Sequence, residues 1–160
     1  LGIVRGTVRF LSPHDDGLVE WIPSERRKDE RRCLVLIDMV PYAREALPIV
    51  PDDALMDRAI LTLSEKNLGC VLVLDKAGAL AGIITDGDLK RHMAPDLLQK
   101  PVSVVMSRSP RTIDPEALGV EALNIMTRTP GHYLTSLVVM ENGSLAGLIR
   151  LQDCLQAGLV

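Results

Sequence analysis

An internal repeat limits the folds open to this chain more than any other feature of the sequence. Residues 77–84 (AGALAGII) match residues 142–149 (NGSLAGLI) at an offset of 65, and the same offset carries Asp88 onto Asp153. A duplicated unit of about 60 residues is too small to bury much surface alone. The repeat therefore predicts two copies of one supersecondary unit that pack together around a shared core.

The first copy has the pattern strand, helix, strand, turn, strand, helix. A short strand is expected at residues 48–50, followed by an amphipathic helix from 54 to 66 with Met56, Ala59, Ile60 and Leu63 on one face. The apolar segments 71–74 and 80–84 flank a turn at residues 75–78 and predict a hairpin.

The second copy repeats this pattern. A strand is expected at residues 111–113, and Asp114 is expected to cap a helix that has Pro115 at its first position. The turn at residues 141–143 contains Asn-Gly, which is a strong hairpin signal between two apolar segments. At the offset of 65, residues 71–74 of the first copy correspond to residues 136–139.

Composition narrows the class of protein further. Hydrophobic residues make up 47% of the chain and aromatic residues only 2%, which favours an aliphatic α/β core. The net charge of −3 argues against binding of nucleic acid, and no apolar run reaches the roughly 18 residues of a membrane span. The three cysteines, Cys33, Cys70 and Cys154, are expected to be buried, reduced thiols of a cytoplasmic protein.

The chemistry is expected where an apolar strand meets the following helix, in residues 82–89 (GIITDGDL). At such a junction the Thr85 hydroxyl can donate to a phosphate, and the helix N-terminus favours anions. The Asp88 carboxylate can accept from two ribose hydroxyls, and Lys90 and Arg91 are candidate phosphate partners. Replacing Asp88 is expected to cost ligand affinity but little stability, because neighbouring side chains can take over the helix cap.

This motif and the duplication resemble the cystathionine-β-synthase (CBS) domain family over residues 36–160. Residues 66–69, 85–91, 121–126 and 155–160 further resemble the regulatory CBS pair of arabinose-5-phosphate isomerases. The resemblance implies an α/β (α+β) fold of two β-α-β-β-α repeats related by pseudo-two-fold symmetry. It places the first domain at 36–95 and the second at 96–160, after a leader at 1–35.

The resemblance also implies a regulatory module with no catalytic site and no cofactor. Its effector would be an adenosine nucleotide (AMP or ATP) or the sugar nucleotide CMP-Kdo of lipopolysaccharide synthesis. The partner in the isomerase family is a sugar-isomerase (SIS) domain, and CBS pairs associate as homodimers or dimers of dimers. The predicted ligand-binding residues are Ile49, Val50, Gly69, Cys70, Thr85, Asp86, Asp88, Lys90, Arg91, Arg111, Thr112, Arg150 and Asp153.

The second copy departs from the motif. Arg150 stands where the first copy has Thr85, although Asp153 is retained. Two interpretations stay open: the second site is empty, or its guanidinium selects a more anionic ligand, such as one with a carboxylate.

The sequence gives less support to other functions than to nucleotide binding. Asp86-Gly87-Asp88 superficially resembles the nucleophile loop of haloacid-dehalogenase phosphatases, but the repeat keeps only the second aspartate. His14, His92 and His132 do not have the spacing of a zinc site. A ligand-free dimerisation module remains the alternative.

The leader offers a strand-like segment at 4–10 and a segment of mixed charge at 26–32.

Overall fold

The computed structural model describes residues 46–128 and 133–159. The leader at 1–35, with Cys33 and His14, lies outside the described residues, and so does His132. No helix in the described ranges is both long and apolar enough to cross a membrane.

The first unit contains the predicted elements in the predicted order. They are β1 (Ile49–Pro51), α2 (Met56–Lys66), β2 (Cys70–Leu74), β3 (Leu80–Thr85) and α3 (Asp86–Arg91). β2 lies in the centre of a three-stranded sheet, parallel to β1 and antiparallel to β3.

The second unit repeats this topology. Its elements are β4 (Thr112–Ile113), α5 (Gly119–Thr127), β5 (Ser136–Glu141), β6 (Ser144–Arg150) and α6 (Leu151–Gln156). β5 is the central strand, again parallel to the first strand and antiparallel to the third. The two units therefore confirm the predicted α+β pair of β-α-β-β-α repeats.

The two hairpins align differently from the prediction. Val73 pairs with Gly82 in the first unit and Val139 pairs with Gly147 in the second, so the central strands correspond at an offset of 66 and the third strands at 65. The cause is the turn: five residues separate the pair Leu74–Leu80, and four separate its counterpart Met140–Leu145. Because side chains alternate along a strand, this one-residue difference makes Ser136 the counterpart of Cys70 rather than of Val71.

The second long helix also begins later than predicted. Asp114 does not cap it; Asp114 Oδ1 accepts a hydrogen bond from the Glu116 N–H at 2.8 Å, and its carbonyl accepts from Ala117 at 3.1 Å. These bonds close a turn around buried Pro115, and α5 begins only after Leu118. The aspartate satisfies the turn locally, as Asp commonly does when Pro follows it.

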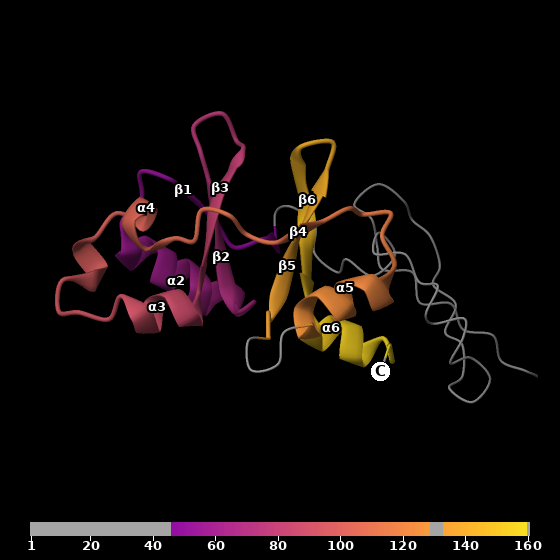
Figure 1. Ribbon diagram of the computed structural model, residues 1–160. Coiled ribbons are helices and arrows are strands. Elements are labelled where there is room, and N and C mark those ends of the chain that lie inside the picture. Colours follow the sequence, from indigo (N-terminus) through magenta and orange to yellow (C-terminus); the bar gives the residue numbers. More distant parts are fainter. Residues whose placement is uncertain (1–45, 129–132, 160) are drawn as a thin grey trace, which may run out of the picture.

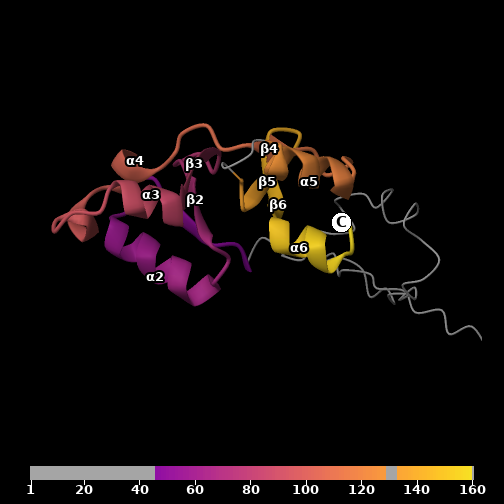
Figure 2. The same ribbon diagram turned by 60° about the horizontal axis from the view of Figure 1, so that its bottom comes forward.

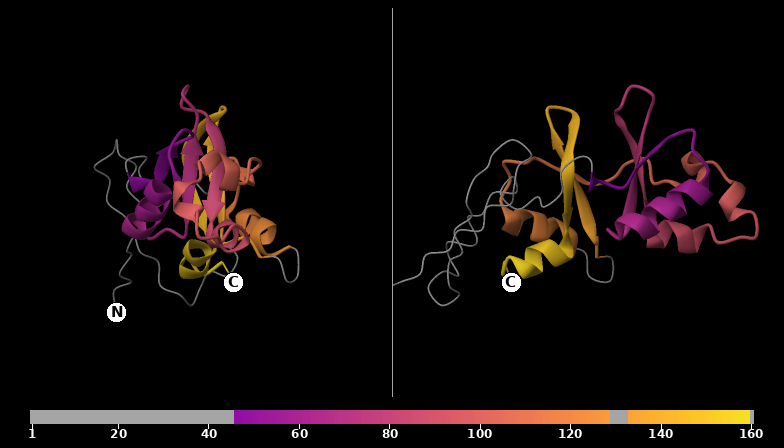
Figure 3. Two further views of the ribbon diagram at one scale, coloured as in Figure 1. Left: turned by 90° about the vertical axis from the view of Figure 1, so that its left-hand side faces the viewer. Right: turned by 180° about the vertical axis from the view of Figure 1, so that it is seen from behind.

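The helices flank the two sheets, and the two hairpins lie side by side between them (Figure 1; Figure 2). On one face of the first sheet, residues such as Val71, Val73 and Ile84 pack against α2. On the other face Leu72 and Ile83 join a cluster that includes residues of the second sheet. The view from behind shows the same order of helices, sheet, sheet and helices (Figure 3).

The segment that joins the two units packs on the first one. It holds a short 3-10 helix, η3 (Leu97–Gln99), and α4 (Val102–Val105). Leu97, Val102 and Val105 belong to the buried cluster of the first unit. The Val102 N–H donates to the Ala54 carbonyl at 2.9 Å, so the joining segment closes over the start of α2.

Candidate functional site

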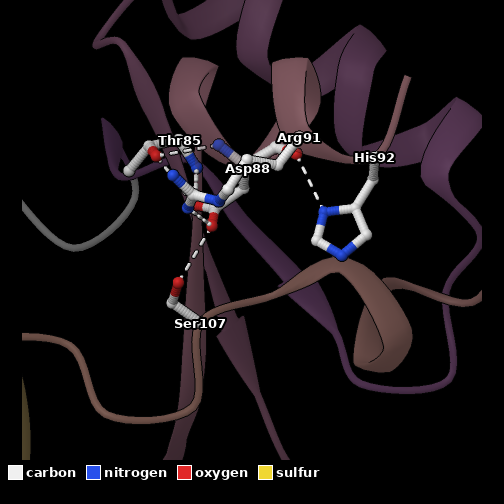
Figure 4. A network of polar contacts seen from close by, with 5 residues as sticks. All are labelled: Thr85, Asp88, Arg91, His92 and Ser107. Atoms are coloured by element: carbon white, nitrogen blue, oxygen red, sulfur yellow. Dashed lines mark hydrogen bonds and ion pairs between the residues drawn. The ribbon is translucent and has the colours of Figure 1, made fainter.

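The first junction is built by residues that hold one another in place. β3 ends at Thr85, whose side chain caps α3 and accepts from the Asp88 N–H at 3.4 Å. In return, Asp88 Oδ2 accepts from the Thr85 N–H at 2.8 Å and from the Thr85 hydroxyl at 2.7 Å. This reciprocal capping box fixes the carboxylate at the end of the strand (Figure 4).

The second carboxylate oxygen of Asp88 is also occupied. Oδ1 accepts from the Arg91 guanidinium and, at 2.9 Å, from the Ser107 hydroxyl (Figure 4). Asp88 is only 2% exposed and is the one charged residue among the buried polar residues of the described chain. Burial alone raises the pKa of this carboxyl, but the hydrogen bonds from Thr85, Ser107 and Arg91 outweigh it and hold the pKa below 3.8, its usual value.

This burial contradicts the expected small stability cost of replacing Asp88. Removal of the carboxylate leaves the donors of Thr85, Arg91 and Ser107 without their acceptor, and a buried unsatisfied donor is costly. Asp88 therefore stabilises the junction as well as offering an acceptor.

Ser107 was missed by sequence reasoning. It follows α4 in the joining segment, 19 residues after Asp88, and no motif marks it. The sequence suggests His92 only as a candidate metal ligand, whereas in the structure its Nδ1 lies 2.9 Å from the Asp88 carbonyl at the end of α3. No group of three possible metal-ligating side chains is found in residues 46–128 and 133–159.

The other residues predicted for the first site fall into two classes. Asp86 and Lys90 are exposed beside the junction, and Gly69, with φ of +76°, leads into β2. Cys70 pairs in register with Thr85 across the hairpin. In contrast, the Val50 side chain is fully buried in the first core and the half-buried Ile49 packs against the cluster between the sheets.

At the second junction Arg150 and Asp153, the counterparts of Thr85 and Asp88, form an internal ion pair. The Arg150 guanidinium donates to both oxygens of the Asp153 carboxylate, from Nε at 3.2 Å and from Nη2 at 2.8 Å. The Arg150 N–H donates to the same carboxylate at 2.9 Å, and both side chains are largely buried, with 19% and 9% exposed. The fixed fork of arginine suits this bidentate contact, which engages both carboxylate oxygens of Asp153.

Two further predicted residues, Arg111 and Thr112, lie at the start of β4. Both are exposed, and the Arg111 carbonyl accepts from the Val138 N–H at 3.1 Å. The structure thus brings Thr85, Asp88 and Arg91 into one cluster. It assembles Arg150 and Asp153 into another.

The two junctions approach each other at Cys70. Burial raises the pKa of this thiol to about 11, while a hydrogen bond with Ser136 and the charge of Arg150 act in the opposite direction. Ser136 is the structural counterpart of Cys70, so equivalent positions of the two units meet here. Residues from the ends of both sheets therefore contribute to one region.

Known proteins are similar to this chain both in sequence and in fold. Residues 39–95 and 102–159 each match the CBS domain family. Arabinose 5-phosphate isomerase KdsD from Yersinia pestis is 33% identical over 132 residues, which cover 81% of this chain and 39% of the relative. The chain thus spans well under half the length of that relative.

Solved structures agree with this match. The CBS-domain containing protein ATU1752 from Agrobacterium tumefaciens has a TM-score of 0.69 and 28% identity, covering 79% of this chain and 94% of that one. CBSX2 in complex with AMP has a TM-score of 0.65 and 23% identity, covering 78% of this chain and 96% of that one. The chain belongs to the CBS domain family, as a tandem pair that resembles the pair in arabinose 5-phosphate isomerases.

Proposed function

We propose that this chain is a regulatory module that binds a nucleotide at the first junction, between Thr85 and Asp88. The observation that carries the proposal is the Asp88 carboxylate, which is held ionised at the end of β3 by four donors. An ionised carboxylate can accept from the paired hydroxyls of a ribose once two of its present donors leave.

The surroundings of Asp88 favour a ligand that also carries phosphate. The side chain of Arg91 is 63% exposed, although its guanidinium reaches the buried carboxylate, and Lys90 beside it is exposed. Ser107, the other group on Oδ1, belongs to an exposed residue. The carboxylate is thus covered by two surface groups that a ligand can displace.

Ribose and phosphate are shared by AMP, ATP and CMP-Kdo, which are the effectors we propose. AMP is the ligand printed for the CBSX2 structure, and the likeness to KdsD motivates the sugar nucleotide. The Arg150 guanidinium would suit the carboxylate of CMP-Kdo only if that acid displaces Asp153. Experiment must therefore decide which base the ligand carries and whether it carries the sugar acid Kdo.

The proposal also covers the partner domain, the absence of catalysis, the location in the cell and the bounds of the two units. The module would act on an SIS isomerase domain, as the isomerase resemblance suggests, and would catalyse no reaction itself. We propose a cytoplasmic location, where such nucleotides are available. We propose sequence units at 36–95 and 96–160, and the joining segment at the start of the second range packs on the first unit.

A thermal-shift panel with AMP, ATP, CMP and CMP-Kdo tests this function. A ligand that binds the native state alone raises the melting temperature, by an increment equivalent to about 2.7 kcal/mol at a ligand concentration 100 times Kd. We expect a saturable shift with at least one of the four and little shift with Asp88→Asn. No shift with any of them would refute nucleotide sensing.

A second proposal, that two chains associate, rests on exposed apolar residues of the helices. Leu61 in α2, Val104 in α4 and Leu155 in α6 are 63%, 59% and 49% exposed. A second copy would cover such residues through an isologous contact. We expect light scattering to report a homodimer or a dimer of dimers at tens of micromolar, roughly, where a typical interface is occupied. Association without any thermal shift would favour a ligand-free dimerisation module.

A further inference from the structure

The segment that joins the two units is attached to the proposed ribose acceptor. Ser107 follows α4, and its hydroxyl donates to Asp88 Oδ1 at 2.9 Å (Figure 4). The same oxygen accepts from Arg91. The two donors from outside the capping box therefore share one oxygen, and one of them belongs to the joining segment.

The backbone of the joining segment forms an antiparallel bridge with β3. The Ser107 N–H donates to the Ile83 carbonyl at 2.8 Å, and the Ile83 N–H donates to the Ser107 carbonyl at 3.0 Å. Next to this bridge, a Cβ on Gly82 would lie 2.7 Å from Met106 Sδ and 2.8 Å from the Ser107 carbonyl oxygen. The glycine thus permits a close approach that sets Ser107 beside Asp88.

The donors on Asp88 differ in how readily they can leave. The bonds from Thr85 are part of the capping box and span three residues, so they persist with the helix. The Arg91 side chain is largely exposed and can swing toward solvent or a phosphate. Ser107 is 19 residues away and is held through its own backbone bridge.

We propose that a bound ribose takes the places of Ser107 and Arg91 on Asp88, and so removes the side-chain attachment of the joining segment at Ser107 and loosens the backbone bridge beside it. The two ribose hydroxyls supply two donors in exchange for the two that leave. Arg91 becomes available to the phosphate, and the link to the second unit loses a side-chain attachment beside β3. This inference rests on the proposed function, because it takes Asp88 as the ribose acceptor.

Calorimetric titration of the full chain with AMP, and in parallel with CMP, tests the exchange. Ser107→Ala removes a donor that the ligand must otherwise displace, so we expect it to bind about 3- to 10-fold more tightly than the unmodified chain. Ser103→Ala is the matched control: it lies in α4, and its hydroxyl makes no hydrogen bond in the described part of the chain. We expect its affinity to be unchanged.

Arg91→Gln gives an independent test whose sign depends on the ligand. Loss of the guanidinium should strengthen binding of adenosine, which has no phosphate, and weaken binding of AMP. Amide hydrogen exchange should show faster exchange of the Ser107 N–H when AMP is bound, because its bridge to Ile83 is loosened.

The outcomes separate this inference from the function on which it depends. If neither nucleotide binds the unmodified chain or any variant, the proposed function fails. If the unmodified chain binds and Ser107→Ala binds equally or more weakly, the function stands and the exchange is refuted. Slower exchange of the Ser107 N–H on binding would likewise show that the ligand clamps the joining segment.

Discussion

The two units share one backbone plan but use their junctions in opposite ways. In the first, Asp88 accepts from Thr85, Arg91 and Ser107, so its partners include a group from outside the motif. In the second, the side chain of Arg150 replaces the threonine and takes both oxygens of Asp153. The same acidic position thus accepts from the joining segment in one unit and is half of an internal ion pair in the other.

The contrast shows how one side chain can change a duplicated site without changing the fold. Both junctions end the third strand and begin a six-residue helix, and in both the aspartate accepts from the backbone N–H of the last strand residue. Only Thr85 returns a side-chain bond to the helix, because a guanidinium cannot accept one. A ligand at the first junction would, in our proposal, displace two donors from outside the box. A ligand at the second would have to separate a largely buried arginine from its carboxylate, which leaves two charges to be satisfied at once.

The largest expected effect compares Asp88→Asn with Asp153→Asn. The first change removes charge-assisted hydrogen bonds to the ribose and should weaken nucleotide binding by about 10- to 100-fold. The second should change affinity by less than about 3-fold, since Asp153 is paired internally. Titration calorimetry on both variants, with circular dichroism as a check of folding, measures the difference. Equal losses would mean that both junctions hold ligand.

Arg150→Thr should make the second junction resemble the first. Without the guanidinium, Asp153 regains free acceptor capacity beside a threonine, and a second nucleotide should bind per chain. Arg150→Lys is the control, since it keeps a cation next to Asp153 and should leave one nucleotide per chain. Stoichiometry from calorimetry reports the change. A single site in Arg150→Thr would show that more than the ion pair distinguishes the units.

The first junction should also give stability a specific dependence on pH. Because the folded state lowers the pKa of Asp88 below 3.8, its stabilisation is complete above that pH and is lost as the pH falls through the lowered pKa. At pH 7 we expect Asp88→Asn to lower the free energy of unfolding by about 1.5–3 kcal/mol. Urea titrations from pH 7 to pH 2.5 should show this difference shrinking below about pH 4. A difference that is constant over the range would contradict the ionised network.

The smallest effect concerns the two described thiols. Burial raises the pKa values of Cys70 and Cys154 to about 11, so only about one thiol in a thousand is ionised at pH 8. In a Cys33→Ser variant, both should react slowly with iodoacetamide and at similar rates. Faster labelling of Cys70, located by mass spectrometry, would mean that the contact between the units opens before the second core.

The repeat made the topology predictable, because periodicity and turn residues reveal the strands and helices locally. The offset of the central strands was wrong by one residue, since the apolar pattern around Val71 does not reveal the longer first turn. Thr85 and Asp88 could be found from the motif. Ser107 could not, because only the folding of the joining segment over Gly82 brings it to the carboxylate.

The pairing of Arg150 with Asp153 could not be predicted from the sequence either. The arginine was visible as a departure from the motif, but its direction depends on packing around a largely buried side chain. It could equally have pointed toward a ligand. In the structure the guanidinium pairs with Asp153 of the helix that follows it, which favours the interpretation of an empty second site.

A crystal structure of the full chain with saturating AMP tests the inequality of the two junctions most directly. We predict one nucleotide per chain, with its ribose hydroxyls on the Asp88 carboxylate and with Arg150 still paired to Asp153. A nucleotide bound at Asp153, with Arg150 displaced and the contacts of Asp88 with Arg91 and Ser107 intact, would contradict this account.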